Sequence, residues 1–187
     1  MSGQVDQALI KAAVSEFLRR GYHGMSMESI AATAGVSKRS LYRRWNSKLA
    51  VTRDVFRTLR DERNSVDLGS LEADLRALVT ESTQPEAVKP AAKLVMRTMG
   101  EISGSPGLLT AYRKYLMEPR IERLRGILER ARSRGEVRAD LSTDVACTIV
   151  AGPLMMYYLA VLAEADLRLP TDYRDQFIRS ILRALGA

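Results

Sequence analysis

The sequence predicts an all-α fold, with a small three-helix domain at the N-terminus and a larger helical domain after it, and two observations support this. Apolar residues recur at helical spacing along the chain, and no convincing stretch alternates β-branched with polar residues. The positive charge is concentrated at one end, since residues 1–64 hold 12 Lys or Arg against 6 Asp or Glu, whereas residues 65–187 hold 17 against 16. We therefore expect the two parts to have different partners.

The first domain is expected to cover residues 1–48 and the second domain residues 49–187, connected through a helix over about 47–64. The helices expected first along the chain cover residues 6–20, 27–34, 38–45 and 47–63. Gly21 should end the first of them, because glycine readily adopts the positive φ of a helix C-terminus. Ser26 and Ser37 precede the two short helices, where a serine side chain can accept a backbone N–H.

The second domain has longer helical patterns. The expected helices cover residues 71–82, 86–103, 107–134, 143–165 and 171–185, the third of them broken near Glu118 and Pro119. Residues 145–163 carry no charge over 19 residues, which is long enough for a membrane span. We reject a span because the flanks are acidic, Asp144 and Glu164, and we expect a helix buried on most sides by protein.

Composition narrows the class of protein. Hydrophobic residues make up 46% and charged residues 27%, as in globular proteins, and the net charge of +7 suits an anionic partner. The single cysteine, Cys147, excludes an intramolecular disulfide and a cysteine-based metal cage, so we expect no metal and no cofactor. Asp6 and Lys11 interrupt any N-terminal export segment, and we therefore expect a cytoplasmic protein.

Residues 26–45 read SMESIAATAGVSKRSLYRRW, which is a helix, a glycine turn and a second short helix. Gly35 can take the positive φ that ends the first helix, and Val36 fills the corner. Ser37 can cap the next helix so that its N-terminus points toward an anion. This order is typical of a helix-turn-helix motif.

The second short helix is predicted to have one apolar and one basic face. Leu41 and Trp45 are four residues apart and should face the core, while Arg39 and Arg43 lie on the opposite face. The basic residues of this region, with no acid among them, are Lys38, Arg39, Arg43, Arg44 and Lys48. Such a stripe on its own is often a solvated surface, but together with the turn glycine and the capped helix it favours DNA binding.

Residues 8–56, including the run FLRRGYHGMSMESIAATAGVSKRSLYRRWNSK, resemble the DNA-binding head of the TetR family of bacterial transcription regulators. The resemblance implies an all-helical homodimer whose C-terminal region binds a small effector. It also implies that DNA is approached by Ser26, Thr33, Lys38, Ser40, Tyr42, Arg44 and Lys48. To these our reading of the two helices adds Ser37, Arg39 and Arg43. Arg39 and Arg44 depart from residues common in the family, so no relative's operator can be transferred.

The last two helices are apolar on more than one face, which indicates a two-fold dimer interface of two helices from each subunit. The residues expected there are Val145, Ile149, Met156, Leu159, Phe177, Ile178, Ile181 and Leu182. The alternative is a core helix within a single chain. Two recognition helices in a dimer would read a pseudo-palindromic operator, with half-sites about 34 Å apart.

Flexible and amphipathic side chains in the second domain are candidates for binding an apolar effector. They are Met96, Met99, Tyr112, Tyr115, Met117, Met155 and Tyr158. Methionine and tyrosine at this spacing also occur as ordinary core, so a DNA-binding or partner-binding module without an effector stays open. An enzyme is the other alternative, but His23 lies in a turn and Cys147 in an apolar helix, so we expect no catalytic residue.

Overall fold

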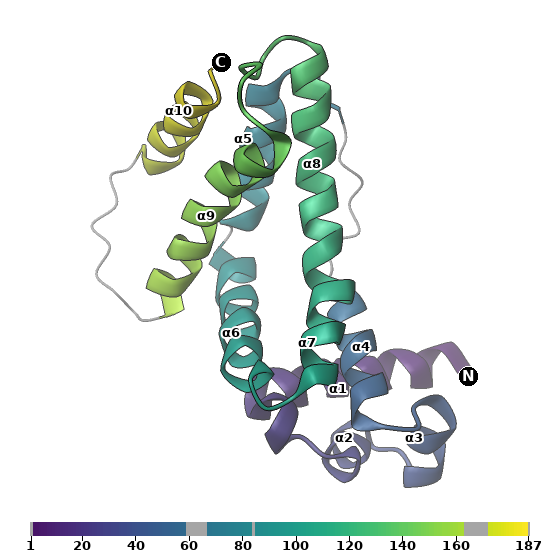
Figure 1. Ribbon diagram of the computed structural model, residues 1–187. Helices are drawn as coiled ribbons and strands as arrows, with labels where there is room; N and C mark the ends of the chain where they lie inside the picture. Colours follow the sequence, from purple (N-terminus) through teal and green to yellow (C-terminus); the bar gives the residue numbers. More distant parts are fainter. Residues whose placement is uncertain (1, 59–66, 84, 163–171, 187) are drawn as a thin grey trace. The chain divides into compact units, whose positions relative to one another are not determined.

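The computed structural model describes residues 2–58, 67–83, 85–162 and 172–186, and within these ranges every regular element is a helix. The all-α prediction is therefore confirmed. In chain order the helices are Ser2–Gly24 (α1), Met27–Ala34 (α2), Lys38–Arg44 (α3), Lys48–Thr58 (α4), Leu71–Ser82 (α5), Pro85–Ile102 (α6), Pro106–Tyr112 (α7), the π-helical segment Arg113–Met117 (η1), Glu118–Ser133 (α8), Thr143–Leu162 (α9) and Tyr173–Leu185 (α10) (Figure 1).

The chain divides into two compact units that do not follow the single cut expected near residue 48. The head unit comprises Met1–Asp61 and Lys93–Pro119, and the body unit comprises Glu62–Ala92 and Arg120–Ala187. All of α4, with α7 and η1, thus belongs with the helix-turn-helix motif. The sequence could not show this, because the segment that joins the head unit lies far along the chain and has no charge pattern of its own.

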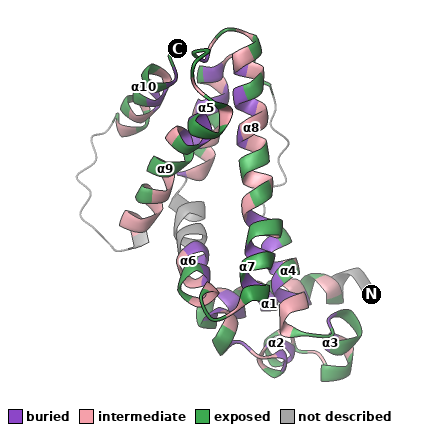
Figure 2. Cartoon of the chain, viewed as in Figure 1, coloured by how far each residue is buried: buried purple, intermediate pink, exposed green. Residues whose placement is uncertain are grey.

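The head unit has one continuous apolar core. The ring of Phe56 from α4 packs edge to face against two other rings. The ring centroids lie 5.5 Å apart for Phe17 of α1 and 6.0 Å apart for Tyr112 of α7. Leu41 and Trp45 are buried in the same core, as their spacing predicted. Most of α3 is exposed (Figure 2). This packing fixes α3 by its inner face and leaves its outer face to solvent.

Most helix limits agree with the sequence, and two differ. Gly21 has φ 74° and interrupts α1 as expected, but one further turn follows it up to Gly24. The break expected near Glu118 is a π-helical segment over Arg113–Met117 that directly precedes it. The C-terminal parts of the helices expected over 47–63 and 143–165 lie outside the described residues.

The body unit is built on α5, α8, α9 and α10, with α10 packed against α5 and α9. Its apolar core includes Leu75 of α5, Ile127 of α8, Val150 of α9 and Leu185 of α10. Each of these side chains is almost completely buried. Each helix thus packs one apolar face into this core, and its other faces lie outside the core.

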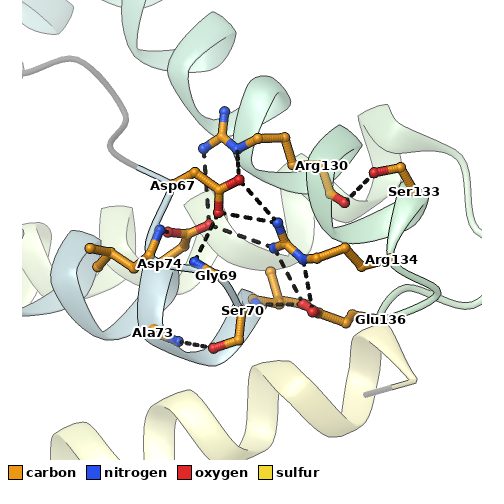
Figure 3. A network of polar contacts seen from close by, with 11 residues as sticks. Asp67, Gly69, Ser70, Ala73, Asp74, Arg130, Ser133, Arg134 and Glu136 are labelled. Carbon is orange, nitrogen blue, oxygen red and sulfur yellow. Dashed lines mark hydrogen bonds and ion pairs between the residues drawn. The ribbon is translucent and has the colours of Figure 1, made fainter.

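A network of charged side chains joins the start of α5 to the end of α8 in the body unit (Figure 3). The buried Asp74 accepts the Leu68 N–H at 2.9 Å and lies 3.9 Å from Arg130 and 3.8 Å from Arg134. Arg134 also pairs with Asp67 at 3.2 Å. Its hydrogen bond to Glu136 is the main reason why its pKa lies above the ordinary arginine value.

The apolar helix α9 differs from its expectation. Thr143–Val161 is long and apolar enough to cross a membrane by length and composition alone, and 17% of its most apolar window is buried within the structure. We expected protein to cover it on most sides, and for a single chain that expectation is wrong. Ala146 and Val150 face the body core, whereas Val145 is 49% exposed and Met156 64% exposed. The described residues of one chain thus leave an apolar face of α9 exposed.

Candidate nucleic-acid interface

The turn between α2 and α3 is held by backbone geometry and two serine caps. Ser26 and Ser29 form a reciprocal capping box at the start of α2, with N–H to Oγ distances of 3.0 and 3.1 Å. Gly35 ends α2 in the left-handed region at φ 66°, which a residue with a side chain adopts only with strain. The Val36 N–H then donates to the Ala31 carbonyl, so the chain turns sharply toward α3.

Two contacts fix the orientation of α3. Ser37 caps it by accepting the Ser40 N–H at 3.2 Å, and the two hydroxyls lie 3.1 Å apart. At the other end, Trp45 Nε1 donates to Asp54 Oδ2 of α4 at 2.8 Å. Leu41 lies buried between these ends. The helix is therefore anchored at both termini and along its inner face.

The outer face of α3 presents cations and one aromatic side chain. Arg39 and Arg43 are exposed, and within the described part of the chain neither has an ion pair. Tyr42 is 48% exposed, which is unusual for an aromatic side chain on a core-anchored helix. Arginines of this kind can contact phosphates or guanine edges, and the tyrosine adds a hydroxyl and an apolar ring.

Other cations of the predicted set already have partners within the protein. Lys38 pairs with Glu28 of α2 at 3.2 Å, and both side chains are exposed. Arg44 pairs with Asp6 of α1 at 2.5 Å and lies over the Trp45 ring at 4.9 Å. These two cations would have to exchange a protein carboxylate for a DNA phosphate on binding.

Lys48 begins α4 and reaches back to the end of α1. Its Nζ donates to the His23 carbonyl at 3.3 Å and lies 4.7 Å from the centre of the Tyr22 ring. The ammonium is therefore held beside the helix-turn-helix motif, and it can donate further hydrogen bonds. An anion near this end of α4 would meet a positioned cation.

Thr33 lies on α2 and donates to Glu16 of α1 at 3.5 Å. Glu16 is buried, and burial alone would raise its pKa. Hydrogen bonds from Arg19 and Ser29, and the charges of Arg19 and Arg20, outweigh burial and hold the pKa below its ordinary value. An ionised Glu16 thus links α1 to the motif from the inside.

Sequence reasoning missed the acidic residues that support this surface. Asp54 holds the Trp45 indole, and Glu28 and Asp6 pair with two of the cations. The position of Asp54 beside Val55, in the inward-facing stretch of α4, was a signal for the first. The other two pairs join residues on different helices, at separations that follow no helical repeat.

The seven expected effector residues are divided between the two units. Those in the head unit are Met96, Met99, Tyr112, Tyr115 and Met117, and those in the body unit are Met155 and Tyr158. Tyr112 is buried against Phe56 in the head core. Ordinary core packing, the alternative to effector binding, therefore accounts for its position. Met99 is 45% exposed, and Tyr115 lies under the Arg57 guanidinium at 4.5 Å. Burial is the main cause that raises the pKa of Tyr158.

The eight expected interface residues also separate by burial. Val145 and Met156 are exposed on α9, and the partly buried members are Ile149, Leu159, Phe177 and Leu182. Ile178 and Ile181 differ from the expectation, since they are 2% and 4% exposed within one chain. They face the chain's own interior on α10, so their side chains are already covered within one chain.

Comparison with known proteins identifies the family of this chain. Residues 9–55 match the model of bacterial regulatory proteins of the tetR family, and residues 65–181 match the model of the tetracyclin repressor-like C-terminal domain. The two matches together span most of the chain. The chain therefore belongs to the TetR family, and it is a DNA-binding transcription regulator rather than an enzyme.

Individual relatives match most of the chain. The helix-turn-helix-type transcriptional regulator YdeS of Bacillus subtilis is 26% identical over 179 residues, which are 94% of this chain and 85% of YdeS. The DNA-binding transcriptional repressor TetR of Mycobacteroides abscessus is 29% identical over 142 residues, 74% of this chain and 73% of the relative. GusR of Salmonella enterica shares the fold with a TM-score of 0.74 at 18% identity, covering 98% of this chain and 96% of GusR.

Proposed function

We propose that this protein is a cytoplasmic repressor that binds a pseudo-palindromic operator as a homodimer and is released by a small effector. The observation that carries the proposal is the outer face of α3, where Arg39, Tyr42 and Arg43 are exposed on a helix anchored by its inner face. Occupying a promoter needs no further surface, which favours repression over activation. The repressor name of the Mycobacteroides relative supports the same direction.

The proposed DNA contacts divide into two kinds. Arg39 and Arg43, with Tyr42, would read base edges in the major groove, because they extend from the exposed side of α3. The remaining contacts would be to the phosphate backbone, and they come from Ser26, Thr33, Ser37, Lys38, Ser40, Arg44 and Lys48. Phosphate contacts supply affinity, whereas base contacts supply sequence preference.

The proposed dimer uses the uncovered face of α9. Val145 and Met156 are exposed there, with Ile149 and Leu159 beside them. On α10, Phe177 and Leu182 remain candidates, and Tyr173 stacks against Tyr157 of α9 at 6.1 Å. A second copy would cover these apolar side chains by two-fold symmetry.

The proposed effector is a small apolar molecule. Met155 and Tyr158 of the body unit are its best-supported contacts, since they are half-buried and are not members of the body core. Methionine adapts to ligand shape, and a tyrosine hydroxyl can orient a polar group. Met96, Met99, Tyr115 and Met117 stay in the proposal as residues of the head unit.

The test is a selection of duplexes from a random-sequence pool by the purified protein, followed by sequencing. We expect an enriched inverted repeat, and sedimentation should show two protein chains per duplex. Thermal-shift screening with apolar compounds, repeated with the selected duplex present, then tests release. Failure to retain any duplex at low salt would contradict the DNA-binding surface, and operator affinity unchanged by every compound would favour a regulator without an effector.

A further inference from the structure

The last turn of α1, residues 21–24, follows the kink at Gly21 and has an unusual construction. Gly21, with φ 74° and ψ −177°, interrupts the helix, and the Met25 N–H closes a new turn onto the Gly21 carbonyl at 3.2 Å. The N–H groups of Tyr22 and His23 therefore open a new turn and, like the first N–H groups of a helix, need an acceptor from elsewhere.

Glu101, in the last turn of α6, supplies that acceptor. Its Oε2 accepts the Tyr22 N–H at 2.6 Å and the His23 N–H at 3.2 Å. A carboxylate that accepts N–H groups at the start of a turn makes short, charge-assisted hydrogen bonds. A Cβ at position 21 would lie 2.0 Å from Glu101 Oε1, so glycine is needed for space as well as for its positive φ.

The same turn holds Lys48 from the other direction. The Lys48 ammonium donates to the His23 carbonyl at 3.3 Å and lies over the Tyr22 ring at 4.7 Å. Ser105, just after α6, adds a contact of 3.3 Å to His23 Nε2. Tyr22 and His23 are thus bound through their N–H groups by Glu101 and through a carbonyl and a ring by Lys48.

We propose that Glu101 is a positioning residue for DNA binding, which fixes the 21–24 turn and through it the place of the Lys48 ammonium. The inference rests on the proposed phosphate contact of Lys48. Without the carboxylate, the N–H groups of Tyr22 and His23 have water as their alternative partner, and the turn that holds Lys48 loses its anchor. Lys48 must then be ordered when it binds the phosphate, and this costs affinity. In the wild-type protein Lys48 is already ordered before binding.

The sign of the effect separates this proposal from simple electrostatics. Removing a carboxylate from a basic protein should by itself strengthen DNA binding, because the net positive charge rises. The proposal predicts the reverse for Glu101→Ala. Glu118→Ala is the matched control, because Glu118 is an exposed glutamate of the same head unit that pairs with Arg113 at 3.4 Å rather than with the 21–24 turn.

The experiment measures binding of full-length variants to a random-sequence duplex of about 30 base pairs between about 50 and 200 mM salt. Glu101→Ala should bind about 5-fold more weakly at low salt, with the slope of log affinity against log salt reduced by about one phosphate contact. Glu118→Ala should bind at least as tightly as wild type, with an unchanged slope. Glu101→Gln, which keeps an acceptor oxygen, should lie between wild type and Glu101→Ala.

Two further measurements distinguish positioning from loss of folding. Lys48→Ala should weaken binding clearly in wild type and much less in Glu101→Ala, because both changes remove the same contact. Amide hydrogen exchange at Tyr22 and His23 should quicken in Glu101→Ala while the Phe56 amide stays protected. Additive losses or an unchanged salt slope would overturn the proposal even if wild type binds DNA, whereas absence of wild-type binding would overturn the proposed function as well.

Discussion

The head unit and the body unit differ in the charged side chains that they present to solvent. In the head unit, Arg39 and Arg43 extend outward from α3. Both are exposed, and neither forms an ion pair with a carboxylate of the described residues. In the body unit, Arg76 pairs with Asp175 at 2.5 Å, Arg125 pairs with Asp144 at 2.7 Å, and a larger network surrounds Asp74. Arg39 and Arg43 are thus available to the external partner that we propose, whereas Arg76 and Arg125 of the body unit pair within the chain.

The surfaces left uncovered differ in the same sense. The head unit exposes cations and Tyr42, which suit a polyanion, whereas the body unit exposes Val145 and Met156, which suit an apolar partner. A regulator that binds DNA as a dimer needs both kinds of surface on one chain. The difference between the two surfaces therefore depends on where the carboxylates lie. In the body, basic and acidic residues are nearly equal in number, so most arginines can have a carboxylate near them.

The largest effect should come from a charge placed on the uncovered face of α9. Met156→Arg is expected to raise the dimer dissociation constant by about 100-fold or more, because an arginine at the centre of an apolar interface would be buried without a partner. Sedimentation over a concentration range measures this. Thr148→Arg, at an exposed position nearer the start of α9, is the graded comparison, and its effect should be smaller. A Met156→Arg protein that stays dimeric would contradict the proposed interface.

The next effect tests the internal role of charge in the body unit. Asp74→Ala should lower the free energy of unfolding by about 2 kcal/mol, since the Leu68 N–H loses its acceptor and Arg130 and Arg134 lose a buried carboxylate. Urea denaturation followed by circular dichroism measures it. Asp140→Ala removes an exposed carboxylate that pairs with Arg138 at 2.8 Å, and it should change stability little. Equal losses for the two variants would contradict a special role for the network.

These two regions also differ in how much the sequence could predict. The helix-turn-helix is local, so Ser26, Gly35 and Ser37 could be assigned from their order, and the limits of α2 agree with the structure. The carboxylate of Glu101 and the buried Asp74 act through contacts with residues far along the chain or in loops, and helical periodicity gives no signal for either. Ile178 and Ile181 show the same limit, because an apolar pattern does not distinguish a chain's own core from a partner's.

A smaller effect should separate the two kinds of DNA contact in the head unit. Lys48→Ala should weaken binding to all duplexes by about ten-fold and reduce the salt slope by about one, because it removes a phosphate contact. Arg39→Ala should instead alter which sequences are enriched in the selection, with a comparable loss on the best wild-type duplex. Binding isotherms on selected and random duplexes measure both. Equal losses on every sequence for both variants would contradict the division of roles.

The smallest effect concerns acid, and it tests whether body carboxylates stabilise the fold in their ionised form. The hydrogen bond from Arg134 lowers the pKa of Glu136 from its usual value near 4.5, burial opposes this, and the Leu71 N–H adds to the lowering. A lowered pKa in the folded state means that the stabilisation is present above about pH 4.5 and is lost as pH falls through the folded pKa. Glu136→Gln should therefore be less stable than wild type at pH 7, and the difference should shrink as pH falls below about 4.5.

Urea titrations of both proteins at a series of pH values between 7 and about 3 measure this difference directly. Glu129→Gln, at an exposed position of α8 in the same unit, is the charge-matched control and should follow wild type throughout. The difference between wild type and Glu136→Gln isolates one carboxylate, although Asp67 and Asp175 also have lowered pKa values and contribute to the acid sensitivity of both proteins. A difference that stays constant down to pH 3 would mean that the Glu136 side chain stabilises the turn through shape and hydrogen bonding rather than through its charge.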